Sequence, residues 1–245
     1  MRGVVRRVRR CGPLLLLVLP WLSACASGGG LAAVGWSGRR PAEPWRLPPD
    51  AYPTQRLYRV KYDGPDGHAA FKLTLYLEDE HRFRMQAADG LGRRLWELDV
   101  DALGDALWLD HRNRRYCAAP GASDLPLVPL ARLPLVSLPK LLLGQLPTSP
   151  AADLRRGEDT VYYRDARGRL WNGGLTDGRL AWWTQVEAGE AVTSWRREGE
   201  DNVFVDRRGE QELRWREVVR EPLAAPPRPL EVPAKYVRFD EASCG

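Results

Sequence analysis

Apolar and polar residues alternate with a period of two in a series of short runs between Leu57 and Val219. From Phe71 to Glu78, for example, every second residue is Phe or Leu. This pattern is typical of antiparallel strands with one buried and one solvated face. No repeat of roughly 20–50 residues is present, which argues against a propeller or a solenoid. We therefore predict a mainly β protein built from consecutive, meandering strands.

The expected strands follow one another along most of the chain. After runs at 58–62, 71–77, 83–85 and 96–100 they cover Ala106–Leu109, Arg114–Ala118, Val161–Arg164, Arg169–Trp171, Leu180–Val186, Ala191–Arg197, Val203–Asp206 and Glu210–Val219, with Tyr236–Phe239 as a last edge strand. Such a sheet either closes as a barrel or wraps around a helix.

One leucine- and proline-rich segment, from Leu125 to Pro147, interrupts the alternation. Ser137 can cap a helix there, Pro139 suits its first turn, and Gly144 with Pro147 ends it. We expect a short apolar helix that covers one side of the sheet. Because one short helix covers little apolar area, we also expect an incompletely filled concave interior that a hydrophobic ligand can occupy.

The N-terminus has the pattern of an export signal. Five arginines precede an apolar run from Leu14 to Leu22, which is too short to span a bilayer. The following Ser23-Ala24-Cys25 resembles the lipobox of bacterial lipoproteins. The resemblance implies that Cys25 becomes the first mature residue and carries the lipid, and Ala26 after it favours the outer membrane over the inner one.

Removal of residues 1–24 leaves 32 basic and 32 acidic residues, because the signal holds five arginines and no acid. The formal charge of +5 therefore belongs to the signal and gives no support to nucleic-acid binding. The domain boundaries that we expect are a signal peptide (1–24), a Gly/Pro-rich tether (25–53), one β domain (54–240) and a C-terminal tail (241–245).

Two cysteines remain in the mature chain besides Cys25, namely Cys117 and Cys244. An exported protein reaches a compartment that permits disulfides, so the two could bridge the tail to the middle of the domain. The alternative is a pair of free thiols, and the sequence leaves both open because it supplies no geometry.

The mature chain resembles the outer-membrane lipoprotein receptor LolB and its LolA-like relatives. Three segments carry the likeness: the hairpin Ala69–Ala87 with its Asp89-Gly90-Leu91-Gly92 loop, the segment from Leu135 to Pro147, and the later aromatic-rich strands. Gly90 stands where the family prefers proline, and the Pro222–Pro233 segment has no counterpart, so we identify a divergent member. The resemblance implies an open antiparallel β half-barrel with a short helical lid.

The resemblance also implies roles for particular residues. Leu91 would be an exposed leucine that helps to deliver acyl chains to the membrane, although a leucine folded onto the core is the alternative. From the alternation, we expect the inner face to line the acyl cavity with Phe71, Leu73, Leu75, Phe83, Met85, Trp96 and Leu98. The expected lid helix presents Leu138, Leu141, Leu142 and Leu146. Inward-facing tryptophans would suit acyl chains, but ordinary sheet packing explains any single one.

No pattern of catalytic, cofactor-binding or metal-binding residues is present in the sequence. His68, His81 and His111 lie far apart at turns, without ligand spacing to Cys, Asp or Glu. Neither a nucleophile elbow nor a phosphate-binding loop occurs. We therefore predict no enzyme, no cofactor and no metal.

The sequence thus favours a lipid-anchored protein on the periplasmic face of the outer membrane. It would bind acyl chains of lipoproteins or lipids, receive them from a LolA-like periplasmic carrier, and deliver them to the bilayer. The alternative is a scaffold or interaction lipoprotein of an envelope assembly, with a filled core and no ligand.

Overall fold

Fourteen strands form one continuous sheet in the computed structural model, which describes residues 43–65, 67–119, 133 and 135–239. The order across the sheet is β14-β6-β5-β4-β3-β2-β1-β13-β12-β11-β10-β9-β8-β7, so β14 and β7 are its open edges. The strands are β1 (Thr54–Gly64), β2 (Gly67–Leu77), β3 (Phe83–Ala88), β4 (Arg94–Val100), β5 (Ala106–Asp110), β6 (Arg115–Ala119), β7 (Pro150–Arg156), β8 (Thr160–Asp165), β9 (Leu170–Thr176), β10 (Arg179–Glu187), β11 (Glu190–Glu198), β12 (Asp201–Asp206), β13 (Gln211–Pro222) and β14 (Val237–Arg238). All neighbours pair antiparallel except β14 and β6, which run parallel.

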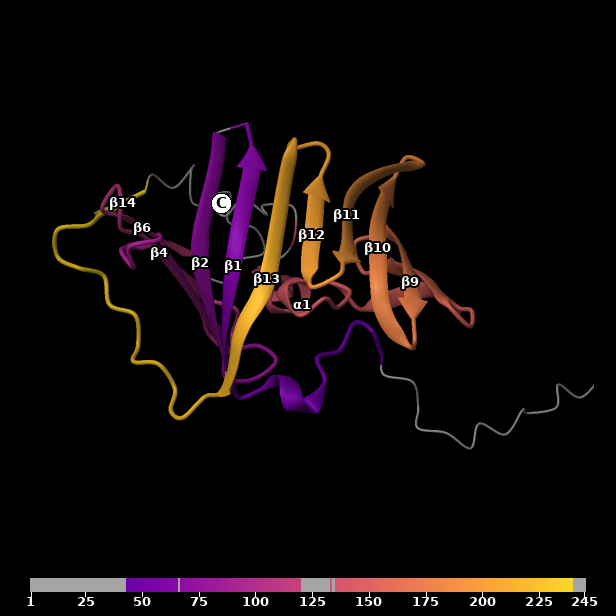
Figure 1. The fold of residues 1–245 in the computed structure, drawn as a ribbon, viewed down its shortest axis with the longest axis horizontal. Helices are drawn as coiled ribbons and strands as arrows, with labels where there is room; N and C mark the ends of the chain where they lie inside the picture. Colours follow the sequence, from indigo (N-terminus) through magenta and orange to yellow (C-terminus); the bar gives the residue numbers. More distant parts are fainter. Residues whose placement is uncertain (1–42, 66, 120–132, 134, 240–245) are drawn as a thin grey trace, which may run out of the picture. The chain divides into compact units, whose positions relative to one another are not determined.

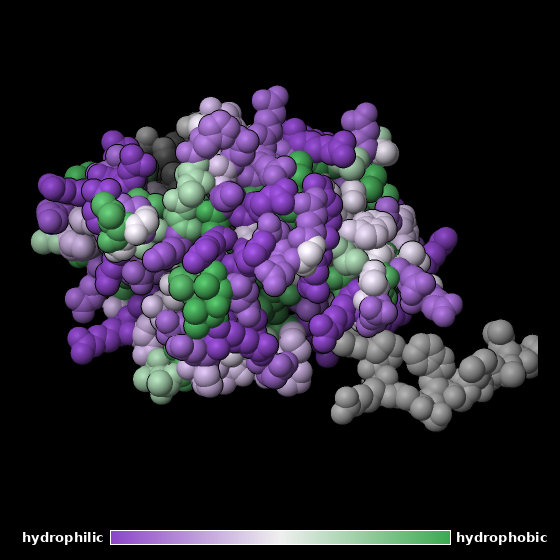
Figure 2. Space-filling model, viewed as in Figure 1, coloured by the Kyte–Doolittle hydropathy of each residue, from purple (hydrophilic) through white to green (hydrophobic). Residues whose placement is uncertain are grey.

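This sheet is an open β half-barrel with a single short helix on one side among the described residues, as the sequence predicts. The helix α1 (Leu138–Leu142) follows a 3-10 turn (Leu135–Ser137) and lies behind β13 and β12 in Figure 1. The side of these strands that faces the viewer is mostly hydrophilic (Figure 2). One face of the sheet is therefore solvated, and the opposite face holds the core.

Strand β7 was not predicted, because six of its seven residues are exposed and no alternation marks it. It pairs with β8 through an irregular register, and Asp153 within it has a positive φ of 56°. A strand of this kind leaves no periodic signal, since neither of its faces is buried.

Three hairpins turn through the same aspartate-capped loop, which begins at Asp89, Asp101 and Asp165. In each, the aspartate Oδ1 accepts the backbone N–H groups two and four residues later, at 2.8–3.0 Å. The fourth residue of each loop is a glycine with φ between 77° and 85°. The side-chain acceptor and the left-handed glycine together fix the turn.

The ordered domain begins before β1. Trp45 and Leu47, which the sequence placed in the tether, are each only 6% exposed and belong to the main hydrophobic cluster. The backbone N–H of Leu146 donates to the carbonyl of Pro44 at 2.7 Å. At least the described part of residues 43–53 therefore packs on the domain.

After β13, the proline-rich segment (223–236) leaves the sheet and returns as β14 beside β6 (Figure 1). The guanidinium of Arg84 holds this segment, with Nη1 donating to the carbonyl of Arg228 at 2.5 Å and Nη2 bonded to Asp99 at 2.6 Å. Phe239 then packs on Trp108 with ring centroids 5.3 Å apart. The expected edge strand at Tyr236–Phe239 is thus present in shortened form.

We predict that Asp165→Ala lowers the free energy of unfolding by about 2–4 kcal/mol, because it leaves the buried Trp171 Nε1 without its acceptor at 2.9 Å and opens the turn. Burial raises the pKa of Asp165, but hydrogen bonds from Trp171 and Arg169 outweigh it and lower the pKa below 3.8. The carboxylate therefore stabilises the fold above that value, and its contribution is lost as pH falls through the lower, folded-state pKa.

Urea denaturation at neutral pH and near pH 3 measures both effects. Glu190→Ala, an exposed position, is the control and should change stability by no more than about 0.5 kcal/mol. A similar loss in both variants at neutral pH would contradict the prediction.

Candidate functional site

The concave face of the β1–β4 half is continuously apolar because the strand register aligns its side chains. Leu75 pairs with Met85, and Met85 pairs with Leu98, so the three lie side by side on one face. Of the predicted inner residues, five are at most 3% exposed: Leu73, Leu75, Phe83, Met85 and Leu98. Phe71 and Trp96 are half-buried, pack against this core, and contact each other with ring centroids 6.5 Å apart.

Aromatic side chains line the other half of the concave face. Trp171, Trp183, Trp195 and Trp215 are each at most 1% exposed. Trp183 contacts Trp171 at 5.3 Å and Phe204 at 6.0 Å between ring centroids. The sequence placed these tryptophans in strands without settling which way they point, and it did not single out Phe204. Trp182, the neighbour of Trp183, points outward and is 43% exposed.

Residues 135–146, which we call the lid segment, cover this face. Its leucines Leu138, Leu141, Leu142 and Leu146 are at most 3% exposed. One polar contact to the sheet comes from Trp215, whose Nε1 donates to the carbonyl of Leu142 at 3.2 Å. Lys140 lies at 3.8 Å from Glu80, and burial lowers the pKa of Lys140 although Glu80 opposes the shift.

The concave-face side chains named above, apart from Phe71 and Trp96, have almost no exposed surface. Three pockets among the described residues open on the outer surface, with volumes of about 400, 590 and 230 Å³. Charged side chains line much of all three. An acyl chain therefore has room on the concave face only if the lid segment moves away from it.

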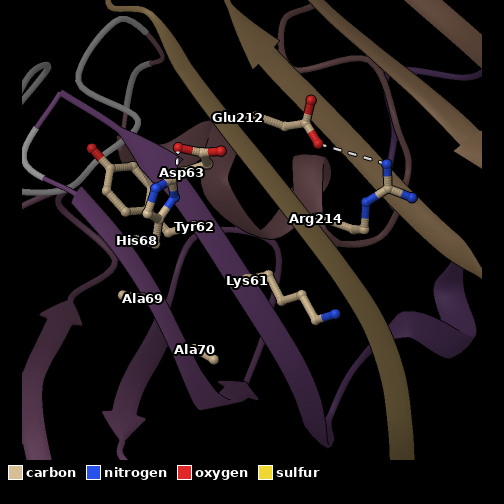
Figure 3. A pocket seen from close by; sticks show the side chains of 8 residues that line it. All are labelled: Lys61, Tyr62, Asp63, His68, Ala69, Ala70, Glu212 and Arg214. Atoms are coloured by element: carbon tan, nitrogen blue, oxygen red, sulfur yellow. Dashed lines mark ion pairs between the residues drawn. The ribbon is translucent and has the colours of Figure 1, made fainter.

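The pocket in Figure 3 lies on the outer face, where β1, β2 and β13 adjoin. His68 pairs with Asp63 at 2.8 Å and Arg214 with Glu212 at 3.6 Å, while Lys61 extends beside them. Because these side chains are charged and largely solvated, the pocket does not suit a hydrocarbon ligand.

Leu91 is 82% exposed at the tip of the β3–β4 turn. Asp89 holds the turn through both carboxylate oxygens, one of which binds Arg93 Nε at 2.7 Å. Hydrogen bonds from the backbone and side chain of Arg93 lower the pKa of Asp89, so the carboxylate stays charged. The turn thus presents Leu91 to solvent and does not fold it back onto the core.

A second leucine, Leu103, is 83% exposed in the equivalent turn between β4 and β5. Because the two turns join opposite ends of β4, Leu91 and Leu103 lie at opposite ends of the sheet. Leu103 was not predicted from the sequence, although both turns share an Asp-x-Leu-Gly pattern that could have revealed it.

The described residues include no group of three or more His, Cys, Asp or Glu side chains placed to hold a metal ion. His111 binds Glu97 at 2.8 Å and the hydroxyl of Tyr236 at 2.7 Å, apart from the other two histidines. Within the same residues, no helix has the length and apolarity needed to cross a membrane.

Several predicted positions lie outside the described residues, namely the signal peptide, the lipidation site Cys25, Cys244 and the tail at 241–245. Cys117 is fully buried in β6 and is disulfide-bonded. The parallel pairing of β14 with β6 brings the C-terminal segment alongside Cys117. Its pairing with Cys244 stays a prediction.

Comparison with solved structures relates this geometry to known folds. A LolA superfamily protein from Nitrosomonas europaea superposes with a TM-score of 0.51 at 10% identity, over 76% of this chain and 92% of that chain. The domain has a LolA-like fold. No family model and no curated protein matches the sequence.

Two further structures align less well. An outer membrane lipoprotein-sorting protein domain from Vibrio parahaemolyticus has a TM-score of 0.47, and a DUF1329 family protein from Desulfovibrio piger has one of 0.45. Each is 5% identical and is aligned over 71% of this chain and 87% of its own.

We predict that Gly144→Ala loosens the lid segment of this LolA-like domain. Gly144 has a φ of 68°, and an added Cβ would lie 2.9 Å from Trp195 Cζ2. We expect a loss of about 1–3 kcal/mol in unfolding free energy, from backbone strain plus overpacking.

Gly178→Ala is the matched control, because its φ of 71° carries the same backbone cost while its added Cβ would meet no atom within 4 Å. Denaturant unfolding of both variants, with tryptophan fluorescence as the signal, separates the destabilisation by backbone strain from the destabilisation by overpacking against Trp195. Equal losses would show that the lid segment does not press on Trp195.

Proposed function

We propose that this protein binds the acyl chains of lipoproteins or lipids on its concave face and delivers them to the outer membrane. It would be anchored there by lipid on Cys25, facing the periplasm. The main support for this proposal is how the apolar concave face is covered. A helix of only five residues, α1, lies over its leucines and tryptophans.

So short a helix is not stable by itself, since isolated helices of fewer than about 12 residues are marginal in water. Its structure depends on the leucines that it buries against the sheet. An acyl chain can replace those contacts, because each buried CH₂ contributes about 0.8 kcal/mol whichever molecule supplies it. Closure of the lid segment in the empty protein would offset the cost of exposing the concave face.

The polar contacts of the lid segment are few. Those described above are the Trp215 bond to Leu142, the Leu146 bond to Pro44, and the long Lys140–Glu80 pair. Among the described residues, displacement therefore breaks few hydrogen bonds, and Trp215 Nε1 and the Pro44 carbonyl then need new partners. The lid segment thus loses few polar contacts on opening, and an acyl chain can replace its apolar ones. Both points support exchange between a closed, empty state and an open, acyl-bound state, without any enzymatic step.

The complete burial of the concave-face tryptophans favours a second candidate function, a scaffold or interaction lipoprotein without a ligand. Trp171, Trp183 and Trp195 have no exposed surface in the closed state. If the lid segment never leaves, these side chains form an ordinary core, and the outer surface alone would contact partners.

Acyl binding distinguishes the two functions. We expect the protein, purified from its native membrane, to carry lipids or lipidated proteins that mass spectrometry identifies. A fluorescent fatty-acid probe should also bind and shift the emission of the concave-face tryptophans. Absence of co-purified lipid together with no probe binding would favour the scaffold.

Leu91→Glu should abolish delivery of acyl chains to vesicles and leave folding and probe binding unchanged, because Leu91 touches the solvent and not the core. Leu103→Glu is the matched control in the equivalent turn at the other end of β4, and delivery should survive it. Transfer of a bound fluorescent lipid to acceptor vesicles measures both. Unimpaired transfer by Leu91→Glu would refute the role of the turn.

A further inference from the structure

Five arginines lie in the turn of Leu91 and in the neighbouring β5–β6 turn at the same end of the sheet, and we call them the basic rim: Arg93, Arg94, Arg112, Arg114 and Arg115. All five are exposed. The first two come from the β3–β4 turn and the start of β4, and the others from the β5–β6 turn and the start of β6. The backbone N–H of His111 donates to the carbonyl of Leu95 at 3.0 Å, so the two turns are neighbours.

Near the basic rim, Glu231 is exposed and lines a pocket with Arg94, whereas three other acids are engaged in hydrogen bonds or ion pairs. Asp110 is buried, and its oxygens accept the backbone N–H groups of Arg112 and Asn113 and the Asn113 side chain at 2.6–3.1 Å. Glu97 is 4% exposed and is bonded to His111. Asp89 is neutralised by Arg93. The outward-facing charge around Leu91 is consequently positive.

Two arginines of the basic rim, Arg112 and Arg114, have no ion pair within the described part of the chain. Arg115 contacts the ring of Phe239 at 5.3 Å and, among the described residues, forms no ion pair. Arg94 reaches the shared oxygen of Glu97 only at 3.4 Å and is 58% exposed. Three or four guanidinium groups are therefore available to an external anion.

The opposite end of the sheet is acidic. The turn around Leu103 carries Asp101 and Asp105 and no basic residue. The turn between β2 and β3 contains three acids, Glu78, Asp79 and Glu80, against one arginine, Arg82, which pairs with Glu78 at 3.6 Å. The two exposed leucines thus lie in the same kind of loop, but one is surrounded by positive and the other by negative charge. An anionic surface would attract the first end and repel the second.

We propose that Leu91 and the basic rim form one docking surface for an anionic phospholipid bilayer. Leu91 inserts between the lipids while the arginines bind headgroup phosphates, for which the planar guanidinium is well suited. The acidic end then points away from the bilayer. This inference deepens the delivery step and rests on the proposed function for what is delivered, but docking itself needs no cargo.

The test uses the mature chain with Cys25→Ser, which removes the proposed lipid, and vesicles of phosphatidylcholine with or without one-third phosphatidylglycerol. In co-sedimentation at low salt we expect at least tenfold tighter binding to the anionic vesicles, lost at high salt because screening weakens charge attraction. Each arginine near an anionic surface contributes roughly fivefold in affinity. The double variant Arg112→Gln/Arg114→Gln should therefore bind the anionic vesicles at least tenfold more weakly.

The matched control is Arg155→Gln/Arg179→Gln, which removes the same charge from exposed positions of β7 and β10 in the other half of the sheet. It should bind as tightly as the parent chain. Equal binding of the parent to both vesicles, or an equal loss in the two double variants, would overturn the proposal. The fatty-acid probe titrated in parallel tests the proposed function separately, so a protein that binds the probe but not the vesicles refutes only the docking surface.

Discussion

The whole structure depends on burying the apolar face of an open sheet. A closed barrel would cover that face with its own opposite wall, but here β14 and β7 remain edges, and the face needs another cover. The lid segment, Trp45 and Leu47 supply part of it, and inward-pointing tryptophans fill the remainder. Cover and sheet are therefore mutually dependent, because neither the five-residue helix nor the concave face is stable without the other.

The alternation in the sequence was sufficient to predict the strands and much of their orientation. Leu73, Leu75 and Leu98 are buried as a period of two requires, and the helical interruption begins at the predicted leucines. Strand β7 was not predicted because neither of its faces is buried. The burial of Trp45 and Leu47 was not predicted either. A proline-rich composition indicates an extended chain but does not reveal whether its few large side chains reach a core.

The state of the interior was beyond prediction from the sequence. Whether a concave face is hollow depends on the summed volumes of side chains from ten or more strands, and on which of two adjacent tryptophans points inward. Trp182 and Trp183 illustrate this, since one is 43% exposed and the other fully buried. The aspartate-capped turns, by contrast, are visible as a recurring sequence pattern, and their rigidity explains why Leu91 and Leu103 project in defined directions.

The first strand, β1, begins at the acidic end of the sheet, remote from Leu91. Seventeen residues separate Cys25 from Glu43, and fully extended they span at most about 60 Å. Strand β1, with 11 residues, is only about 37 Å long. Under the lipid anchoring proposed at Cys25, a segment of this length would allow the domain to present either end of the sheet to the membrane.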